Sequence, residues 1–247
     1  MKSCWVLGCR VDALTLNEAL EVLGRFIASG KPHYVVTLNA EMAYRAMHDP
    51  RFRDIVNRAG LVTPDGAGIV WAARVLGNPV PERVAGIDLV QALAVRAAEE
   101  GWRLFLYGGA PGVAEEAGRR LKERHPGLNI LGTSHGYLSP GKEEELLKNL
   151  KKTSPDVLLV ALGSPKQEYW MARHLAGLGI PVAIGVGGSL DVLAGRAKRA
   201  PRFMQELGLE WLYRVVREPK RVKRALALPK FMIAVLAEAR RTRGRRK

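Results

Sequence analysis

The chain has few cysteines and no recognisable set of metal ligands. Cys4 and Cys9 are the only cysteines in 247 residues; they are too few for a disulfide framework and lack the spacing of a zinc site. The five histidines are scattered, and no two aspartates are separated by a single residue, as they are in the Asp-x-Asp motif that holds a divalent ion. We therefore expect a protein of a reducing compartment that uses neither a metal nor a cofactor.

Long hydrophobic runs are also missing. Residues 231–237 (FMIAVLA) are apolar, but a helix needs about 20 such residues to cross a bilayer. Near the start of the chain, Arg10 and Asp12 interrupt an apolar stretch too early for the core of a signal peptide. The sequence therefore predicts a cytoplasmic protein without a membrane-spanning helix.

Three common catalytic fingerprints are absent as well. The stretch GVGGSLD at residues 185–191 has Leu190 where the dinucleotide-binding motif Gly-x-Gly-x-x-Gly requires its last glycine, and no P-loop lysine pattern occurs. No serine stands in a Gly-x-Ser-x-Gly elbow. These absences disfavour a nicotinamide-dependent enzyme and a serine hydrolase.

Acidic residues are scarce only at the end of the chain. The net charge is +15, yet residues 1–195 contain 22 Lys and Arg against 20 Asp and Glu, whereas residues 196–247 contain 17 against 4. This asymmetry predicts a nearly neutral core at residues 1–195 and a basic appendage at residues 196–247. Such an appendage meets an anionic partner, which could be lipid headgroups, nucleic acid or a phosphorylated substrate.

The rest of the sequence alternates between strand-like and helical patterns. Continuous apolar strands separated by helices of crossover length predict an α/β fold with a largely parallel sheet covered on both faces. We predict strands at residues 4–8, 33–38, 60–63, 103–108, 128–132, 156–162 and 181–186, and helices that include residues 16–29, 87–100, 113–124 and 143–152.

Polar or glycine-rich residues follow the ends of several predicted strands. Ligands collect at the carboxyl ends of parallel strands, so repeated polar residues there favour one shared crevice. Each loop taken alone also fits a tight turn, and Asp65 between Pro64 and Gly66 is typical of one. The residues concerned are Thr37, Asn39, Asp65, Gly108, Gly109, Gly163, Ser164, Gln167, Gly187, Gly188 and Asp191.

The basic appendage has the pattern of an amphipathic element. Arg214, Arg217, Arg221 and Arg224 are spaced three, four and three residues apart, which places them along one stripe of a helix, although Pro219 breaks or kinks it. Apolar residues at 203–216 and 226–236 supply the other side. We favour an interfacial membrane helix; the alternatives are a helix docked on the core with a solvated charged face, and a nucleic-acid-binding segment.

Six blocks of this sequence, in order, closely resemble the WecG/TagA/CpsF family of bacterial glycosyltransferases. The similarity extends from about residue 5 to about residue 235 and excludes the final RRTRGRRK. The blocks are TLNAEMAY (37–44), TPDGAGIVWAARVLG (63–77), RVAGIDLV (83–90), LYGGAPGVAEEA (106–117), LGSPKQEYWM (162–171) and the long stretch from GVGGSLD to REPKR (185–221).

The resemblance implies a Rossmann-like core with a helical C-terminal appendage at the inner face of the cell membrane. It further implies metal-independent, inverting transfer of N-acetylmannosamine from its UDP donor to undecaprenyl-diphosphate-linked N-acetylglucosamine. The product would be an early intermediate of wall teichoic acid or a related polymer. An N-acetylmannosaminuronic acid or glucose-type donor remains the alternative, because one pocket residue can discriminate such sugars.

The resemblance also implies roles for particular residues. Asp65 matches the catalytic base, which takes the proton of the acceptor hydroxyl. Thr37, Asn39 and Gln167 match positions near the donor or acceptor sugar. The expected substrate-binding residues are Arg83 for the diphosphate, Tyr137 and Asp191 for the uracil end, Gly108, Gly109, Gly187 and Gly188 for close backbone approach, and Arg214, Arg221 and Arg224 for closure over the diphosphate.

Two other classes of function remain as alternatives. A basic nucleic-acid-binding protein would explain the charge but not the polar strand ends, and it predicts a steeply salt-dependent affinity. A UDP-sugar epimerase is weakened by the missing dinucleotide motif. We therefore expect a UDP-sugar, a polyprenyl-diphosphate-linked acceptor and an anionic membrane as partners, and no nucleic acid. A homo-oligomer is compatible with the sequence.

Overall fold

A computed structural model describes residues 2–206, 208–217 and 227–244 of the chain. Its central feature is a six-stranded, all-parallel sheet with the strand order β4-β3-β8-β7-β5-β6. The α/β prediction is therefore confirmed. The strands are β3 (His33–Leu38), β4 (Leu61–Pro64), β5 (Arg103–Gly108), β6 (Asn129–Ser134), β7 (Val157–Ala161) and β8 (Val182–Gly185).

Helices cover both faces of the sheet, because its strands carry apolar side chains on both sides. Val35 and Val36, neighbours on β3, are both fully buried but lie in different core clusters. One face packs against α1 (Leu16–Ser29), α5 (Gly86–Glu100), α6 (Val113–Arg124) and α9 (Ser189–Leu193). The other packs against α2 (Ala40–His48), α3 (Pro50–Arg58), α4 (Ala67–Val75), α7 (Pro140–Thr153) and α8 (Lys166–Leu178).

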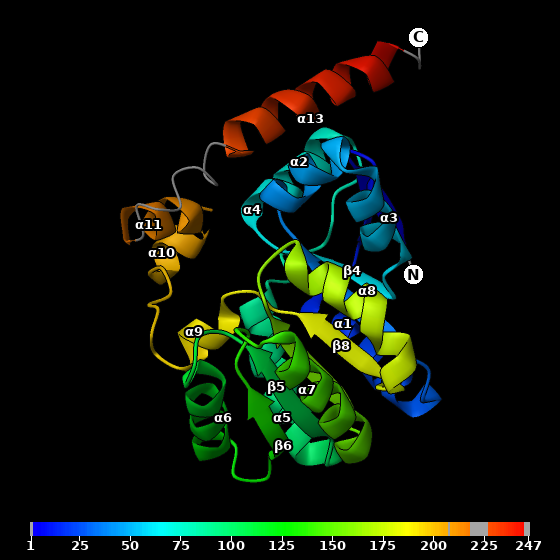
Figure 1. The fold of residues 1–247 in the computed structure, drawn as a ribbon. Coiled ribbons are helices and arrows are strands. Elements are labelled where there is room, and N and C mark those ends of the chain that lie inside the picture. Colours follow the sequence, from blue (N-terminus) through cyan, green and yellow to red (C-terminus); the bar gives the residue numbers. More distant parts are fainter. Residues whose placement is uncertain (1, 207, 218–226, 245–247) are drawn as a thin grey trace.

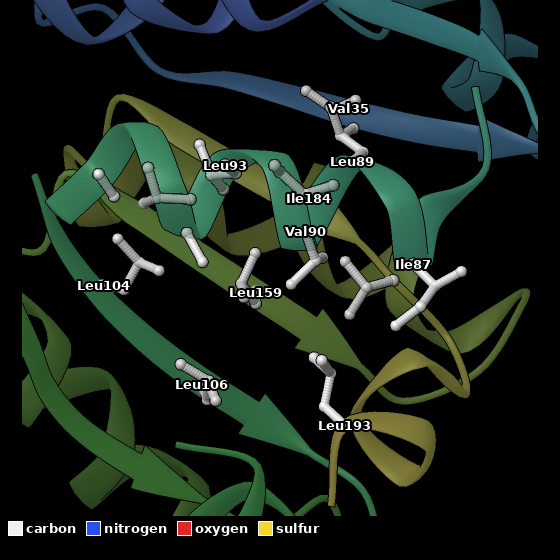
Figure 2. Close-up of a cluster of buried hydrophobic side chains, with 14 of the residues drawn as sticks. Val35, Ile87, Leu89, Val90, Leu93, Leu104, Leu106, Leu159, Ile184 and Leu193 are labelled. Atoms are coloured by element: carbon white, nitrogen blue, oxygen red, sulfur yellow. The ribbon is translucent and has the colours of Figure 1, made fainter. Parts of the chain in front are cut away.

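The long helix α5 shows how the first face is filled. Figure 2 shows Leu89, Val90 and Leu93 of α5 in one cluster with Leu159 and Ile184 of the central strands. All five side chains are fully buried. Fully burying a side chain of this size contributes roughly 1.5–3 kcal/mol relative to leaving it exposed. This packing anchors the helix, so the position of its first turn above the strand ends is fixed.

The N-terminal strands form a separate hairpin. The strand predicted at residues 4–8 is β1 (Ser3–Val6), and it pairs antiparallel with β2 (Cys9–Asp12), which was not predicted. Leu7 and Gly8 between them both have positive φ, as a tight two-residue hairpin turn requires. The buried Asp12 carboxylate accepts the main-chain N–H of Val62 at 2.8 Å. The hairpin is thus tied to the edge strand β4 without joining the sheet.

The C-terminal part of the chain contains α10 (Arg202–Glu206), α11 (Glu210–Arg217) and α13 (Ala227–Gly244). Figure 1 shows α13 running across α2 and α4, with α10 and α11 above α9 and to the left of α4. Phe231, Val235 and Ala239 of α13 are buried. The helix is therefore docked on the core, as the alternative interpretation expects, while Met232, Ile233 and Leu236 stay exposed. The division at residue 195 remains a prediction.

Candidate functional site

The carboxyl ends of β3, β4 and β8 bring several predicted site residues together. The buried hydroxyl of Thr37 donates to the carbonyl oxygen of Gly185 at 2.9 Å. The main-chain N–H of Asp65 donates to the carbonyl oxygen of Leu38 at 2.8 Å. Asp65 therefore lies beside the end of β3, two residues beyond Thr63, which is the partner of Thr37 in the paired strand. These contacts place a carboxylate, a hydroxyl and a glycine loop at one edge of the sheet.

Asn39 follows directly and has a structural role of its own. Its Oδ1 accepts the main-chain N–H of Met42 at 3.0 Å, so Asn39 is the N-cap of α2. Asparagine is among the preferred N-cap residues because its short side chain satisfies a free N–H of the first helical turn. With its oxygen engaged in this way, the amide nitrogen of Asn39 is the group that could donate to a ligand.

Gln167 lies deeper, beneath the loop that follows β8. Its Oε1 accepts the main-chain N–H of Gly187 at 3.0 Å, and its Nε2 donates to Oε1 of Glu168 at 2.7 Å. Gln167 is almost fully buried and Glu168 is fully buried. Burial raises the pKa of the Glu168 carboxyl, and the hydrogen bond from Gln167 opposes that rise.

The start of α5 points into the same region. No described side chain caps this helix, whose N-cap is Ala85. A Cβ added to Gly86 would lie 3.4 Å from the Thr37 hydroxyl and 3.6 Å from the hydroxyl of Ser189. The first N–H groups of a helix lack intrahelical partners and, with the helix dipole, favour an anion. This region thus has donors suited to a phosphate beside two hydroxyls.

The predicted diphosphate residue Arg83 lies in a cluster of four charged side chains that the sequence did not indicate. Its Nη1 donates to Glu210 of α11 at 2.6 Å, and its Nη2 lies 3.9 Å from Asp88. Arg199 binds both oxygens of Asp88, at 2.6 and 2.8 Å. The hydrogen bond from Arg199 to Asp88, with Glu210 nearby, raises the pKa of Arg199 further. The cluster ties the C-terminal part of the chain to the first turn of α5.

The Gly108–Gly109 loop is shaped first of all by contacts within the chain. Both glycines have positive φ, and a Cβ on Gly108 would overlap the carbonyl oxygen of Ala161 at the end of β7. Gly109 in turn accepts the main-chain N–H of Gly136 at 2.8 Å. The glycines are therefore needed for packing whether or not a ligand binds. Tyr137, which follows Gly136, is 76% exposed.

The second glycine loop lies next to Asp191. A Cβ on Gly188 would lie 3.9 Å from Oδ2 of Asp191, in the first turn of α9. The carbonyl oxygen of Asp191 accepts the N–H of Arg196 at 2.9 Å. A cavity of about 420 Å³ opens nearby between the first turns of α6 and residues 194–196. The loop and the carboxylate thus adjoin each other, whereas the cavity is lined by residues of α6 and by residues 194–196, farther along the chain.

Three predicted residues are not placed in the site by the structure. Arg214 belongs to α11, but its side chain is outside what the structure describes, and Arg221 and Arg224 lie outside the described residues altogether. In the described part of the chain, no three His, Cys, Asp or Glu side chains lie close enough to hold a metal ion. The same residues contain no helix that is long and apolar enough to span a bilayer.

Comparison with known proteins shows what this chain resembles. Residues 4–245 match the sequence model described as the glycosyl transferase WecG/TagA/CpsF family. The chain is 37% identical over 215 residues to the N-acetylglucosaminyldiphosphoundecaprenol N-acetyl-β-D-mannosaminyltransferase of Bacillus spizizenii, covering 87% of this chain and 83% of that protein. A protein of the same name from Staphylococcus aureus is 33% identical over 96% of this chain and 92% of its own length.

Proposed function

The chain belongs to the WecG/TagA/CpsF family of glycosyl transferases, and we propose that it transfers N-acetylmannosamine from UDP-N-acetylmannosamine to undecaprenyl-diphosphate-linked N-acetylglucosamine. The names of the relatives from Bacillus and Staphylococcus support both the sugar and the lipid-linked acceptor. The reaction would supply an early intermediate of wall teichoic acid or a related surface polymer.

One observation supports placing the reaction at the carboxyl ends of β3 and β8. Asp65 emerges beside the end of β3, where Thr37 is bonded to Gly185 and the uncapped start of α5 approaches. Asp65 would accept the proton of the acceptor hydroxyl while that oxygen forms its bond to the anomeric carbon. The bond between the anomeric carbon and the UDP oxygen breaks on the opposite face, so the configuration inverts. A positioned base of this kind contributes roughly 10²- to 10⁴-fold.

The leaving UDP must be stabilised as its negative charge develops. The first N–H groups of α5 and the guanidinium of Arg83 are the described donors suited to that task, since fixed dipoles and cations cost no reorganisation during reaction. Arg214, Arg221 and Arg224 would add positive charge when the C-terminal part of the chain closes over the diphosphate. Metal would then not be required.

The nucleoside would lie along the two glycine loops. Gly108 and Gly109 end β5, and Gly187 and Gly188 follow β8; neither loop has side chains that would block a base or ribose. Asp191, beside the second loop, would accept a hydrogen bond from the uracil N–H. Tyr137 is exposed and could cover the ring by stacking.

The C-terminal helices would bring the enzyme to its lipid-linked acceptor at an anionic membrane surface. Trp211, Leu212 and Val216 of α11 are exposed, as are Met232, Ile233 and Leu236 of α13. Exposed apolar side chains beside a basic chain end are typical of a helix lying in a membrane interface. The enzyme would work at the inner face of the cell membrane.

The proposed function is tested by UDP release with a short-chain, diphosphate-linked N-acetylglucosamine acceptor. We expect UDP to appear only when UDP-N-acetylmannosamine and acceptor are both present, with a β-linked disaccharide as product. Parallel reactions with UDP-N-acetylmannosaminuronic acid and UDP-glucose identify the donor. UDP release that does not require the acceptor, or the lack of UDP release with every donor, would overturn the proposal.

A further inference from the structure

Glu168 is a buried carboxyl that has no role in the proposed reaction. It lies in the first turn of α8, next to Gln167, and its side chain is fully buried. An acidic residue complements the dipole of a helix start equally well at the surface. Burying a carboxyl costs free energy unless its hydrogen bonds repay the loss of water. The position of Glu168 is therefore explained only if its contacts serve a purpose.

The hydrogen bond between Glu168 and Gln167 fixes the amide of Gln167. Oε1 of Glu168 accepts from Nε2 of Gln167 at 2.7 Å, and this leaves Oε1 of Gln167 to accept the N–H of Gly187 at 3.0 Å. A glutamine amide has a donor end and an acceptor end that are nearly the same shape. Without an acceptor at residue 168 the amide could turn over and set its NH₂ group against the N–H of Gly187. The carboxyl removes that alternative.

The amide has little room to find another arrangement. A Cβ on Gly185 would lie only 2.7 Å from Nε2 of Gln167 and 3.1 Å from the methyl group of Met171. The absence of a side chain at Gly185 therefore lets the amide reach the loop that follows β8. Gly187 itself has a positive φ of 49°, so the main-chain N–H that donates to Gln167 belongs to a residue in a conformation that the loop must maintain.

We propose that Glu168 is a positioning residue that orients the amide of Gln167 and thereby holds the Gly187–Gly188 loop in the shape that binds the donor nucleotide. The binding part of this inference rests on the proposed function, whereas the orientation of the loop does not. Glu168 touches neither substrate nor reacting atoms. Its effect passes through one side chain, from carboxyl to amide to main-chain N–H.

Glu168→Leu tests the proposal, because leucine is apolar and cannot accept a hydrogen bond. We expect the Gly187 amide to exchange its hydrogen with solvent about tenfold faster, and the KM for the UDP-sugar to rise about tenfold with a smaller change in kcat. Glu168→Gln keeps a carbonyl acceptor and should restore both values nearly to those of the wild type. Glu168→Asp keeps the carboxyl but moves the acceptor away from Gln167, so it should give intermediate values. This variant serves as the test if Glu168→Leu does not fold.

Glu143→Leu is the matched control. Oε1 of Glu143 also accepts a hydrogen bond from α8, from the indole N–H of Trp170 at 2.7 Å, but it does not contact Gln167. This variant should leave exchange at Gly187 unchanged. Unchanged exchange at Gly187 in Glu168→Leu or Glu168→Asp would overturn the proposal. Exchange needs no substrate, so it remains informative if the wild type transfers no sugar and the proposed function fails.

Discussion

Asp65 is positioned by its main chain, which limits what its substitution should disturb. Its N–H donates to Leu38 and to Thr63, at 2.8 and 3.0 Å, and these bonds survive a change of side chain. We expect Asp65→Asn to lower turnover by roughly 10²- to 10⁴-fold, the usual contribution of a positioned base. UDP affinity, measured by calorimetry, should stay within about threefold because the main-chain bonds are kept. Near-normal turnover would return Asp65 to the role of a turn residue.

The buried carboxyl of Glu168 should make stability depend on pH. Burial raises its pKa in the folded protein above the ordinary value of 4.5, so the folded state binds a proton more readily than the unfolded state does. Its contribution to stability is therefore complete below the unfolded pKa and is lost as pH rises through the folded pKa. Relative to the wild type, Glu168→Gln should gain stability as pH rises above about 4.5, read as a growing difference in urea midpoint. A pH-independent difference would contradict this.

The sequence could predict the residues that end strands, but not those that act through partners distant in sequence. Asp65 and Gln167 stand out because polar residues follow apolar strands there. Arg199 and Glu210 gave no signal, since their partners Asp88 and Arg83 lie more than 100 residues away. Glu168 looked like an ordinary acidic residue in a first helical turn, and only its burial sets it apart.

Among the elements, α11 contacts the predicted diphosphate residue Arg83 through the carboxylate of Glu210. The Glu210 carboxylate accepts a hydrogen bond from Nη1 of Arg83 at 2.6 Å, and Arg199 donates to both carboxylate oxygens of Asp88. A diphosphate that binds Arg83 would have to displace Glu210. We therefore expect Glu210→Gln to tighten UDP binding about two- to tenfold, because a charged competitor becomes a neutral one.

Asp54→Asn provides the control for this charge change. Asp54 pairs with Arg58 on the exposed side of α3, so its neutralisation raises the net charge equally without touching Arg83. Calorimetry at two salt concentrations separates a local effect from a general one. Weaker UDP binding in Glu210→Gln would show that Glu210 supports the bound state rather than competing with it.

The uncapped start of α5 and the arginines would give the diphosphate of the proposed donor its binding partners. If they suffice, chelation with EDTA should leave turnover within about twofold of its value without chelator. A magnesium-dependent enzyme in the same buffer verifies that the chelator is effective. Loss of turnover that returns on adding magnesium would show that protein donors alone do not stabilise the leaving group.

Elements with a regular apolar pattern could be predicted from the sequence. Elements that are held by tertiary contacts of polar residues could not. The helix over residues 16–29 was predicted at the observed bounds of α1, whose start is fixed by a capping box between Thr15 and Glu18. β2 was missed because Arg10 and Asp12 break the apolar pattern of a four-residue strand. Its polar residues are explained only by tertiary contacts, such as that between Asp12 and Val62.

For the molecule as a whole, the charge asymmetry should separate membrane binding from turnover. Neutralising Arg240, Arg241, Arg243, Arg245 and Arg246 should weaken binding to phosphatidylglycerol vesicles by about tenfold or more, since each basic residue near such a surface contributes about 1 kcal/mol. Turnover with a water-soluble acceptor should change little. Equal losses in both assays would place these arginines in the active site instead.

Removing the whole C-terminal part would not test its charge alone. Phe231 and Val235 of α13 are fully buried among residues of α2 and α4. Truncation at residue 195 would uncover that apolar face, and large losses of core side chains cost about 2–5 kcal/mol each. Point substitutions of exposed arginines test charge without this damage.

The place of β8 in the sheet has a consequence for how the protein is made. β8 is the last strand of the sheet in the sequence, yet it lies in the interior, between β3 and β7. A nascent chain that has left the ribosome only as far as β7 holds β3 with β4 and β5 with β6 and β7, each group with an unpaired apolar edge open to aggregation. Residues 182–185 join the two groups, and the bond between Thr37 and Gly185 closes a loop of 148 residues. The strand ends that carry Thr37 and Gly185 can therefore come together only after residues 182–185 have been synthesised.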